Sequence, residues 1–289
     1  MDPRERVELA LESSVMGASR DGCPPGLAAA VRHAIFPGGA RVRPLLCLGV
    51  SVACGDGAPK AADAAAAAIE LLHCASLVHD DLPCFDDADL RRGKPSVHRA
   101  FGEPIAVLTG DALIVLAFET MAMACRNAPR MLPDLVSILS KAVGMSGGLA
   151  AGQAWESEAN VPLATYHGAK TGSLFVAATK AGALAAGADP LAWEEFGSRL
   201  GEAYQIADDI RDACSTSAEL GKPVGRDVAL GRPSAIRNFG LEDAFKHLDG
   251  LVDSALSAVP ACPGAAELKS IVRRQVRWFV PKESALHAA

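Results

Sequence analysis

The chain has 289 residues, of which 50% are hydrophobic, 5% aromatic and 21% charged, and its formal net charge at pH 7 is -6. This composition is typical of a globular protein and excludes a fibrous or disordered chain. A negative chain without a long Lys/Arg run disfavours nucleic-acid binding, because phosphate contacts need a basic surface that displaces counterions. We therefore expect no nucleic-acid partner, and we expect any bound phosphate to be held by a local group of cations.

The sequence also carries predictions about compartment. Residues 1–6 include acids where a secretory signal carries net positive charge, and no apolar segment follows them, so we expect a cytoplasmic protein. The most apolar segments are interrupted by Asp63, Glu70, Asp111 or Glu119. None supplies the roughly 20 uninterrupted apolar residues of a transmembrane helix, so we expect no such helix. The eight cysteines form no Cys-x-x-Cys pair, which disfavours disulfides and structural zinc.

From about residue 60 the chain is rich in Ala, Leu and Glu, with Gly and Pro at the interruptions, and this pattern favours an all-α fold. The clearest helix covers residues 61–78, and Pro83 prevents its regular continuation. Further helices are expected at 104–118, 132–145, 163–186, 191–212, 241–259 and 265–279. Because no repeat, linker or composition shift divides the chain, we expect residues 1–289 to form one domain, a bundle of about ten or more helices.

A first acidic cluster follows the predicted helix 61–78. Residues 80–89 contain five carboxylates, at Asp80, Asp81, Asp86, Asp87 and Asp89. Such crowding is unfavourable unless a cation neutralises it. On a continuous helix Asp80 and Asp86 would point about 240° apart. A break at Pro83 predicts instead that the chain folds Asp86 back toward Asp80.

A second acidic cluster consists of Asp208, Asp209 and Asp212. Asp208 and Asp212 are i and i+4 and therefore share one helix face. Two carboxylate clusters facing each other suit Mg²⁺, which takes some oxygen ligands from carboxylates and the rest from water or phosphate. The alternative interpretation is a pair of solvated helix ends, where Asp commonly caps. The apolar helical sequence before each cluster disfavours that alternative.

Cationic residues follow both clusters and also open a later helix. They are Arg91, Arg92, Lys170, Lys222, Arg226 and Arg232. Arg suits bidentate phosphate contacts and Lys a single contact. Individually each fits a surface charge, but together they indicate a diphosphate site.

Taken together, these motifs resemble the trans-isoprenyl diphosphate synthases, or polyprenyl synthetases, and within them the bacterial geranylgeranyl and farnesyl diphosphate synthases. The matching segments are FPGG at 36–39, RVRP at 41–44, LLH at 71–73, HDD at 79–81, LRRGKP at 90–95, GDAL at 110–113, GQ at 152–153, KTG at 170–172 and YQIADD at 204–209. A class I terpene cyclase would share the first acidic motif but carry an Asn/Ser/Glu-type second motif, which differs from residues 208–212.

The resemblance implies helices around a deep cavity, a homodimer, and three Mg²⁺ ions, or Mn²⁺ in their place, between the two clusters. The implied metal ligands are Asp80, Asp81, Asp86 and Asp208, with Asp209 and Asp212 in support. The implied ligands of the allylic diphosphate are Arg91, Lys170, Lys222 and Arg232, and those of isopentenyl diphosphate are Arg43, His73 and Arg92. Thr171 and Gln205 would line the reacting centre. The implied reaction is ionisation, condensation and proton loss, with carotenoid biosynthesis as one use of the product.

Product length depends on the helix before the first cluster, because the growing chain runs alongside it. Farnesyl-forming relatives typically carry an aromatic residue five positions before the first Asp, where this chain has Ala75, followed by Ser76. The small side chains predict a twenty-carbon product, geranylgeranyl diphosphate. The alternatives are that Ala75 only packs one helix against another, or that the product is farnesyl diphosphate.

Two positions depart from the family pattern. Arg211 stands inside the second acidic cluster, where an apolar residue is commoner, and could point outward or pair with Asp212. Ala40 stands where a Lys usually follows Gly-Gly, which removes an expected contact to isopentenyl diphosphate worth about 1.5–3 kcal/mol. This departure leaves open a third hypothesis, a catalytically weak regulatory subunit of a heteromeric synthase. Two intact acidic clusters oppose it, because a chain released from catalysis has no reason to retain such unfavourable groups of charge.

Overall fold

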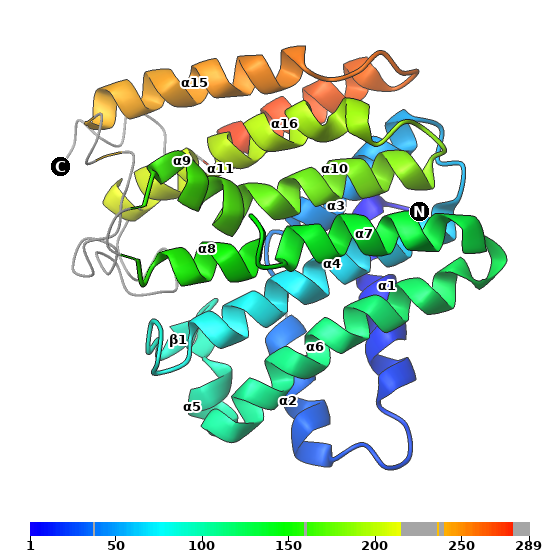
Figure 1. The fold of residues 1–289 in the computed structure, drawn as a ribbon, viewed down its shortest axis with the longest axis vertical. Helices are drawn as coiled ribbons and strands as arrows, with labels where there is room; N and C mark the ends of the chain where they lie inside the picture. Colours follow the sequence, from blue (N-terminus) through cyan, green and yellow to red (C-terminus); the bar gives the residue numbers. More distant parts are fainter. Residues whose placement is uncertain (37, 159–160, 215–235, 237–239, 280–289) are drawn as a thin grey trace.

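The computed structural model describes residues 1–289 except 37, 159–160, 215–235, 237–239 and 280–289, and the described part is almost entirely helical (Figure 1). The all-α prediction is therefore confirmed. The helices are α1 (Pro3–Ala18), α2 (Pro25–Ile35), α3 (Val42–Ala53), α4 (Pro59–Asp80), α5 (Val97–Phe101), α6 (Glu103–Ala124), α7 (Leu132–Val143), α8 (Leu149–Trp155), α9 (Leu163–His167), α10 (Ser173–Ala185), α11 (Glu194–Cys214), α15 (Leu241–Ser257) and α16 (Ala265–Phe279). A small antiparallel ribbon pairs β1 (Leu90–Arg91) with β2 (Lys94–Pro95).

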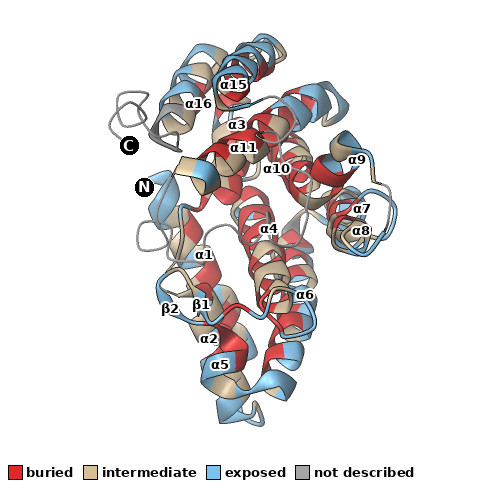
Figure 2. Ribbon diagram, turned by 90° about the vertical axis from the view of Figure 1, so that its left-hand side faces the viewer, coloured by how far each residue is buried: buried red, intermediate tan, exposed pale blue. Residues whose placement is uncertain are grey.

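Helix α4 runs through the middle of the molecule and is buried over most of its length (Figure 2). It begins with Pro59 in its first turn, where a backbone N–H would have no partner within the helix. Its long Ala run lets α3, α6 and α10 pack closely against it. The buried apolar side chains, from Val7 in α1 to Val272 in α16, form one hydrophobic cluster. This packing fixes the end of α4, where the first acidic cluster begins.

Two of the described helices, α4 and α6, are long and apolar enough to cross a membrane by length and composition. In α4, 78% of the most apolar window is buried inside the protein, as expected of a core helix, whereas in α6 only 39% is buried. Both helices contain the charged residues that the sequence analysis noted, and one or two helices of this kind are weak evidence for a membrane span, because core helices of globular proteins pass the same test. Helix α6 keeps an apolar face on the surface.

Other elements differ from the sequence predictions as well, since α5 and α8 were not expected and α6 extends to residue 124, beyond the expected 118. The helix expected over 163–186 is divided into α9, a π-helical turn η3 (Gly168–Gly172) and α10. Three helices, α1, α2 and α3, precede residue 60, where no helix was predicted. Short 3-10 turns also occur at Cys125–Asn127, Pro129–Met131 and Leu191–Trp193.

Candidate active site

A cavity of about 940 Å³ opens among α3, α4, α6, α8, η3 and α11. It will be called the reaction cavity. Four of the six predicted metal ligands line it, namely Asp80, Asp86, Asp208 and Asp212. The predicted substrate ligands Arg43, His73, Arg91, Arg92, Lys170, Thr171 and Gln205 line it as well. Segments from residue 43 to residue 212 thus meet at one site.

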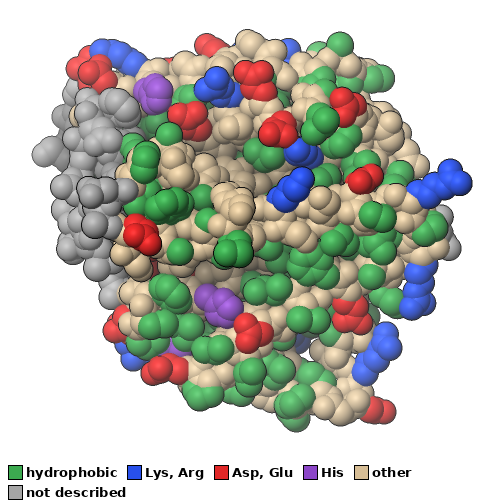
Figure 3. Space-filling view, viewed as in Figure 1, with side chains coloured by type: hydrophobic (Ala, Val, Ile, Leu, Met, Phe, Trp, Pro, Cys, Tyr) green, Lys and Arg blue, Asp and Glu red, His purple; other side chains and the backbone are tan. Residues whose placement is uncertain are grey.

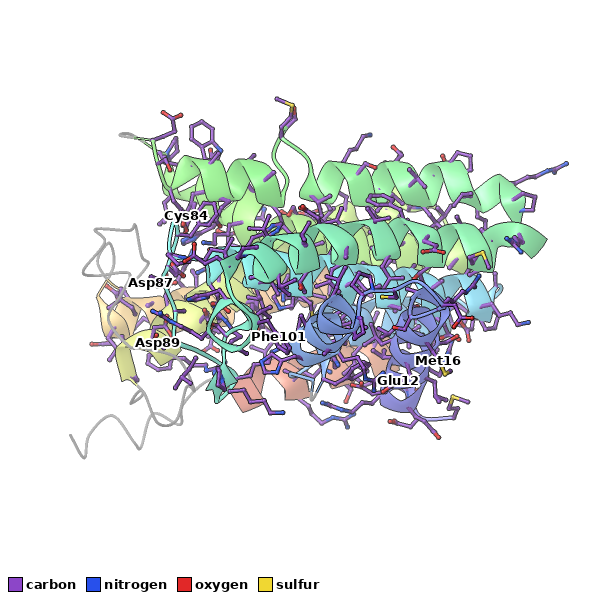
Figure 4. The ribbon with its side chains drawn as sticks, turned by 90° about the horizontal axis from the view of Figure 1, so that it is seen from below. Glu12, Met16, Cys84, Asp87, Asp89 and Phe101 are labelled. Atoms are coloured by element: carbon purple, nitrogen blue, oxygen red, sulfur yellow. The ribbon has the colours of Figure 1, made fainter. Side chains whose placement is uncertain are left out.

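The first acidic cluster folds back on itself after α4 ends. The backbone N–H of Asp86 donates to the carbonyl of Asp80 at 2.9 Å, so both side chains face the reaction cavity. The break expected after Pro83 is therefore confirmed. Asp87 and Asp89 lie on the outer part of the same loop (Figure 4) and pair with the Arg99 guanidinium at 3.1 and 2.7 Å.

Asp81 differs from its neighbours in the first cluster. Its side chain is only 3% exposed and accepts a hydrogen bond from Arg91 Nε at 3.0 Å, and Arg91 Nη2 makes a second contact. Burial by itself lowers the pKa of Arg91, but the hydrogen bond that Arg91 donates to Asp81 and the negative charge of Asp81 outweigh burial and raise that pKa. The structure thus places Asp81 as the carboxylate that orients Arg91 and not on the wall of the reaction cavity.

In the second cluster, Asp208 and Asp212 lie on the cavity face of α11, as their i and i+4 spacing predicts. Asp209 is placed differently, because it accepts a hydrogen bond from Gln205 Nε2 at 2.9 Å. Gln205 Oε1 in turn accepts from the Thr171 hydroxyl at 2.5 Å. This series of hydrogen bonds fixes the orientation of Thr171 at the cavity surface.

Lys170 reaches the cavity from the turn η3. Its ammonium group contacts the carboxylate of Glu156 and lies 3.5 Å from Asp80 Oδ1. Glu156 also accepts a hydrogen bond from the Tyr166 hydroxyl at 2.6 Å. The close approach of α8 to the turn requires Gly152, since a Cβ there would lie 2.5 Å from the Lys170 backbone. Sequence reasoning did not identify Glu156, which follows an Ala-rich segment and stands two residues before Glu158.

A group of arginines lies at the other side of the cavity, around Glu70. The Glu70 side chain is 2% exposed, and its Oε1 is 2.7 Å from Arg41 Nη1 and 3.7 Å from Arg92 Nη2. Arg41 and Arg92 both have positive φ, 54° and 53°, an uncommon backbone conformation for residues other than glycine. A Cβ at Gly39 would lie 2.8 Å from the Arg92 guanidinium, so glycine there leaves room for this arrangement. Glu70 is a second residue that sequence reasoning missed.

Arg43 and His73 are also brought together, with Arg43 Nη1 3.5 Å from His73 Nε2. The Arg43 guanidinium lies over the rings of Phe175 and Tyr204, at 4.9 and 5.5 Å from their centroids. Burial and the nearby Arg43 charge hold the pKa of His73 well below its usual value. Arg43 Nε is buried and has no hydrogen-bond partner among the described residues, which favours an anionic ligand at this position.

The helix face that was expected to limit product length also lines the cavity. Ala75 is 2% exposed and Ser76 is held by a hydrogen bond from its hydroxyl to the His73 carbonyl at 2.8 Å. From these residues the cavity continues to Val107 and Ile114 of α6. Two predicted ligands of the allylic diphosphate, Lys222 and Arg232, lie outside the described residues.

The reaction cavity also fits a hard divalent cation. Asp80 Oδ1 is buried and accepts no hydrogen bond from the part of the chain that the structure describes, although Lys170 lies nearby, so this oxygen can bind a cation. No group of three or more metal-ligating side chains is assembled within the described ranges. Such a site suits Mg²⁺, which usually takes one or two carboxylates and completes its shell with water and phosphate.

Comparison with known proteins identifies relatives over nearly the whole chain. A geranylgeranyl diphosphate synthase of Cereibacter sphaeroides is 51% identical over 281 residues, covering 97% of this chain and 98% of the relative. One of Rhodobacter capsulatus is 50% identical over 269 residues, covering 93% of each chain. The crystal structure of a geranyltransferase from Helicobacter pylori, complexed with magnesium and isoprenyl diphosphate, is 29% identical and covers 96% of both chains with a TM-score of 0.82. The polyprenyl synthetase family model matches residues 24–270, and the chain therefore belongs to that family of Mg²⁺-dependent prenyltransferases.

Proposed function

We propose that this protein is a geranylgeranyl diphosphate synthase, which condenses isopentenyl diphosphate with dimethylallyl, geranyl or farnesyl diphosphate and releases diphosphate. The observation that carries the product assignment is Ala75, a small residue on the wall of the reaction cavity one turn before Asp80. An aromatic side chain there would shorten the cavity. The names of the two relatives with about half of their residues identical support the same product.

In this proposal, metal ions lie between the two acidic clusters and neutralise the charge that develops on the departing diphosphate. Three ions are inferred from the family resemblance. Asp80, Asp86, Asp208 and Asp212 are the direct ligands, because their side chains line the cavity. Asp81 and Asp209 support the site indirectly, through Arg91 and Gln205.

The allylic diphosphate is held by Arg91 and Lys170, and Lys222 and Arg232 are assigned to it by resemblance. Lys170 already lies beside Asp80, so a phosphate oxygen bound at the first cluster comes within its reach. Isopentenyl diphosphate is held by Arg43, His73 and Arg92, and Arg43 supplies a buried donor that has no partner among the described residues. Because Ala40 supplies no cation, these three side chains carry more of the binding.

After diphosphate leaves, the allylic cation reacts in the apolar part of the cavity, away from water. Thr171 and Gln205 line the reacting centre, and the hydrogen bond between them keeps the Thr171 oxygen lone pairs available to face the cation. The condensed cation then loses a proton to the released diphosphate. The described side chains proposed to face the allylic cation, Thr171 and Gln205, are therefore polar and uncharged.

We further propose that a second copy of this chain covers α6. Exposed apolar side chains follow one face of that helix, Val107, Leu108, Ile114, Val115 and Met123, and hydrophobic side chains lie over α6 in Figure 3. Val107 and Ile114 also border the reaction cavity, so a partner on this face would close its side.

We also infer one domain over residues 1–289, supported by the single hydrophobic cluster, and a cytoplasmic location, supported by eight free thiols.

The test is an assay of the purified protein with Mg²⁺, isopentenyl diphosphate and dimethylallyl or farnesyl diphosphate, followed by chain-length analysis. A twenty-carbon product is expected. A fifteen-carbon product would instead support a farnesyl diphosphate synthase. Absence of product, with restoration by a second synthase subunit, would support the regulatory subunit that Ala40 leaves open.

A further inference from the structure

A second cavity, of about 770 Å³, lies on the other side of the turn η3. None of the described residues lines both cavities. Along the chain the two sets alternate, because Lys170 and Thr171 face the reaction cavity whereas His167, Gly168 and Gly172 line the second one. The turn is thus a wall shared by both cavities, and π-helical turns of this kind frequently mark functional sites.

His167 is the buried polar group in the wall of the second cavity. His167 is only 7% exposed, and its Nε2 has no hydrogen-bond partner in the described part of the chain. Burial lowers the pKa of His167 to about 4, so the imidazole is neutral at pH 7. Buried polar atoms are almost always hydrogen-bonded, so an unpaired one in a cavity wall indicates a missing ligand or water.

The remainder of the wall combines apolar side chains with small polar ones. The apolar residues are Ile138, Ala142, Leu163, Ala164, Val176, Ala177 and Ile206, and the uncharged polar ones are Ser137, Ser146, Ser173 and Ser198, with His247 beside them. The ammonium group of Lys180 is paired with Glu194 at 2.5 Å, and the wall also carries the exposed Lys141 and Glu202, whose carboxylate lies 3.8 Å from Arg199. The reaction cavity, by contrast, has an excess of arginines at one side and carboxylates at the other. Among its described lining residues the second cavity has no arginine, and its volume lies in the range of small-molecule sites.

We propose that the second cavity binds an uncharged, mostly apolar small molecule whose single hydroxyl or carbonyl group hydrogen-bonds to His167 Nε2. A neutral imidazole nitrogen donates or accepts according to its tautomer, so either group can pair with it. Because the ligand rests against η3, its binding shifts Lys170 and Thr171 on the opposite side of the same turn. The effect on turnover depends on the proposed function, whereas the binding itself does not.

A substitution at Gly168 can test whether the second cavity binds a ligand. Its backbone is helical, with φ −60° and ψ −44°, and a Cβ there would meet no atom within 4 Å. Because Gly168 lines the second cavity, Gly168→Leu adds a side chain at its wall without a backbone clash. Gly250, in α15, has the same open surroundings and does not line either cavity, so Gly250→Leu is the matched control.

The experiment measures binding of farnesol, an uncharged isoprenoid alcohol, by isothermal titration calorimetry. Wild type, Gly250→Leu and Ala75→Tyr, which narrows the reaction cavity, should all keep one binding event. Gly168→Leu should weaken that event at least tenfold, and His167→Phe should weaken it about two- to tenfold through loss of one hydrogen bond. Binding that survives in Gly168→Leu but disappears in Ala75→Tyr would assign farnesol to the reaction cavity and overturn the proposal.

A second measurement covers the case in which Gly168→Leu does not fold. In protein with ¹⁵N-labelled histidine, farnesol should shift the Nε2 resonance of His167, and an unchanged resonance or no binding to wild type overturns the proposal. Farnesol should also change the KM for the allylic diphosphate in wild type and not in Gly168→Leu. Loss of that kinetic effect alone, with binding and the resonance shift intact, would reject the coupling through η3.

Discussion

The ammonium group of Lys170 is held by the carboxylate of Glu156, at the edge of the reaction cavity and within 3.5 Å of Asp80. This ion pair fixes the position of the Lys170 ammonium group before any diphosphate binds. Without Glu156, Lys170 would turn toward Asp80 and compete with metal for its free oxygen. Glu156 is therefore a positioning residue that acts through Lys170.

Glu156→Gln should lower kcat/KM for the allylic diphosphate by about ten- to hundredfold, since a hydrogen bond to a charged group contributes about 1.5–3 kcal/mol. The Mg²⁺ concentration that gives half-maximal activity should rise as well, because Lys170 then pairs with Asp80. Steady-state kinetics over a Mg²⁺ series measures both effects.

The matched control is Glu12→Gln. Glu12 lies on α1 (Figure 4) and makes an exposed ion pair with Arg32, with two contacts of 3.0 Å, and neither residue lines the reaction cavity. It should keep wild-type kinetics. Equal kinetics and equal Mg²⁺ dependence in Glu156→Gln would show that the pair with Lys170 has no role in catalysis.

Glu70→Gln should destabilise the fold, because Arg41 is fully buried and would lose the charge that neutralises it. Removing one partner of a buried ion pair typically lowers the free energy of unfolding by about 3–5 kcal/mol. The second partner of Arg41, Glu8, is 35% exposed, so Glu8→Gln should have a smaller effect. Urea denaturation compares the two variants, and equal stability of Glu70→Gln and wild type contradicts the role assigned to this pair.

Much of this site could be predicted from the sequence because its acids are grouped. The crowding at residues 80–89, and the i and i+4 spacing of Asp208 and Asp212, led directly to two facing carboxylate clusters. Spacing could not separate Asp80 from Asp81, since only the tertiary fold shows that Arg91 engages Asp81. The helix predicted over 163–186 was wrong at η3, because a π-helical turn uses the same residue types as an α-helix.

Glu70 carried a signal that sequence reasoning did not use. It stands in an Ala- and Leu-rich helix with apolar residues on both sides, and a charge in such a segment is almost always paired when buried. Glu156 carried less signal, since its partner Lys170 is distant in sequence. The helices before residue 60 were missed because α1 alternates charged and apolar residues with little apolar periodicity, and because α2 and α3 are short.

The stability of the protein should fall as the pH is lowered from about 6.5 toward 4. Burial lowers the pKa of His167 to about 4 in the folded protein, below its ordinary value near 6.5, so in this window the unfolded chain binds more protons. His73, whose pKa is also lowered, acts in the same direction. The contribution of His167 to the free energy of unfolding should be about 2 kcal/mol smaller at pH 5 than at pH 7. His167→Phe should reduce this difference in urea denaturation, and an unchanged difference contradicts the assignment.

Replacement of exposed apolar residues on α6 should produce monomers. Leu108 and Val115 are 51% and 66% exposed and do not line the reaction cavity, so Leu108→Glu and Val115→Glu place charge on the proposed interface alone. Analytical ultracentrifugation should give a dimer for wild type and a monomer for either variant. Leu191→Glu, at an exposed position in the turn before α11, is the control and should stay dimeric. A monomeric wild type rejects the interface.

Ala75→Tyr should change the main product from twenty to fifteen carbons. The phenol ring would occupy the part of the reaction cavity beside Ala75, where the last isoprene unit is expected to lie, so elongation stops one unit earlier. Activity with dimethylallyl diphosphate should persist, because the diphosphate end of the cavity is not altered. Asp80 lies more than one helical turn beyond Ala75 on α4, and Lys170 lies beside Asp80. Ala75→Ser, which adds little volume, is the control and should keep the twenty-carbon product. If Ala75→Tyr is folded and still makes mainly the twenty-carbon product, the length is set elsewhere, for which Val107 and Ile114 are the next positions to replace.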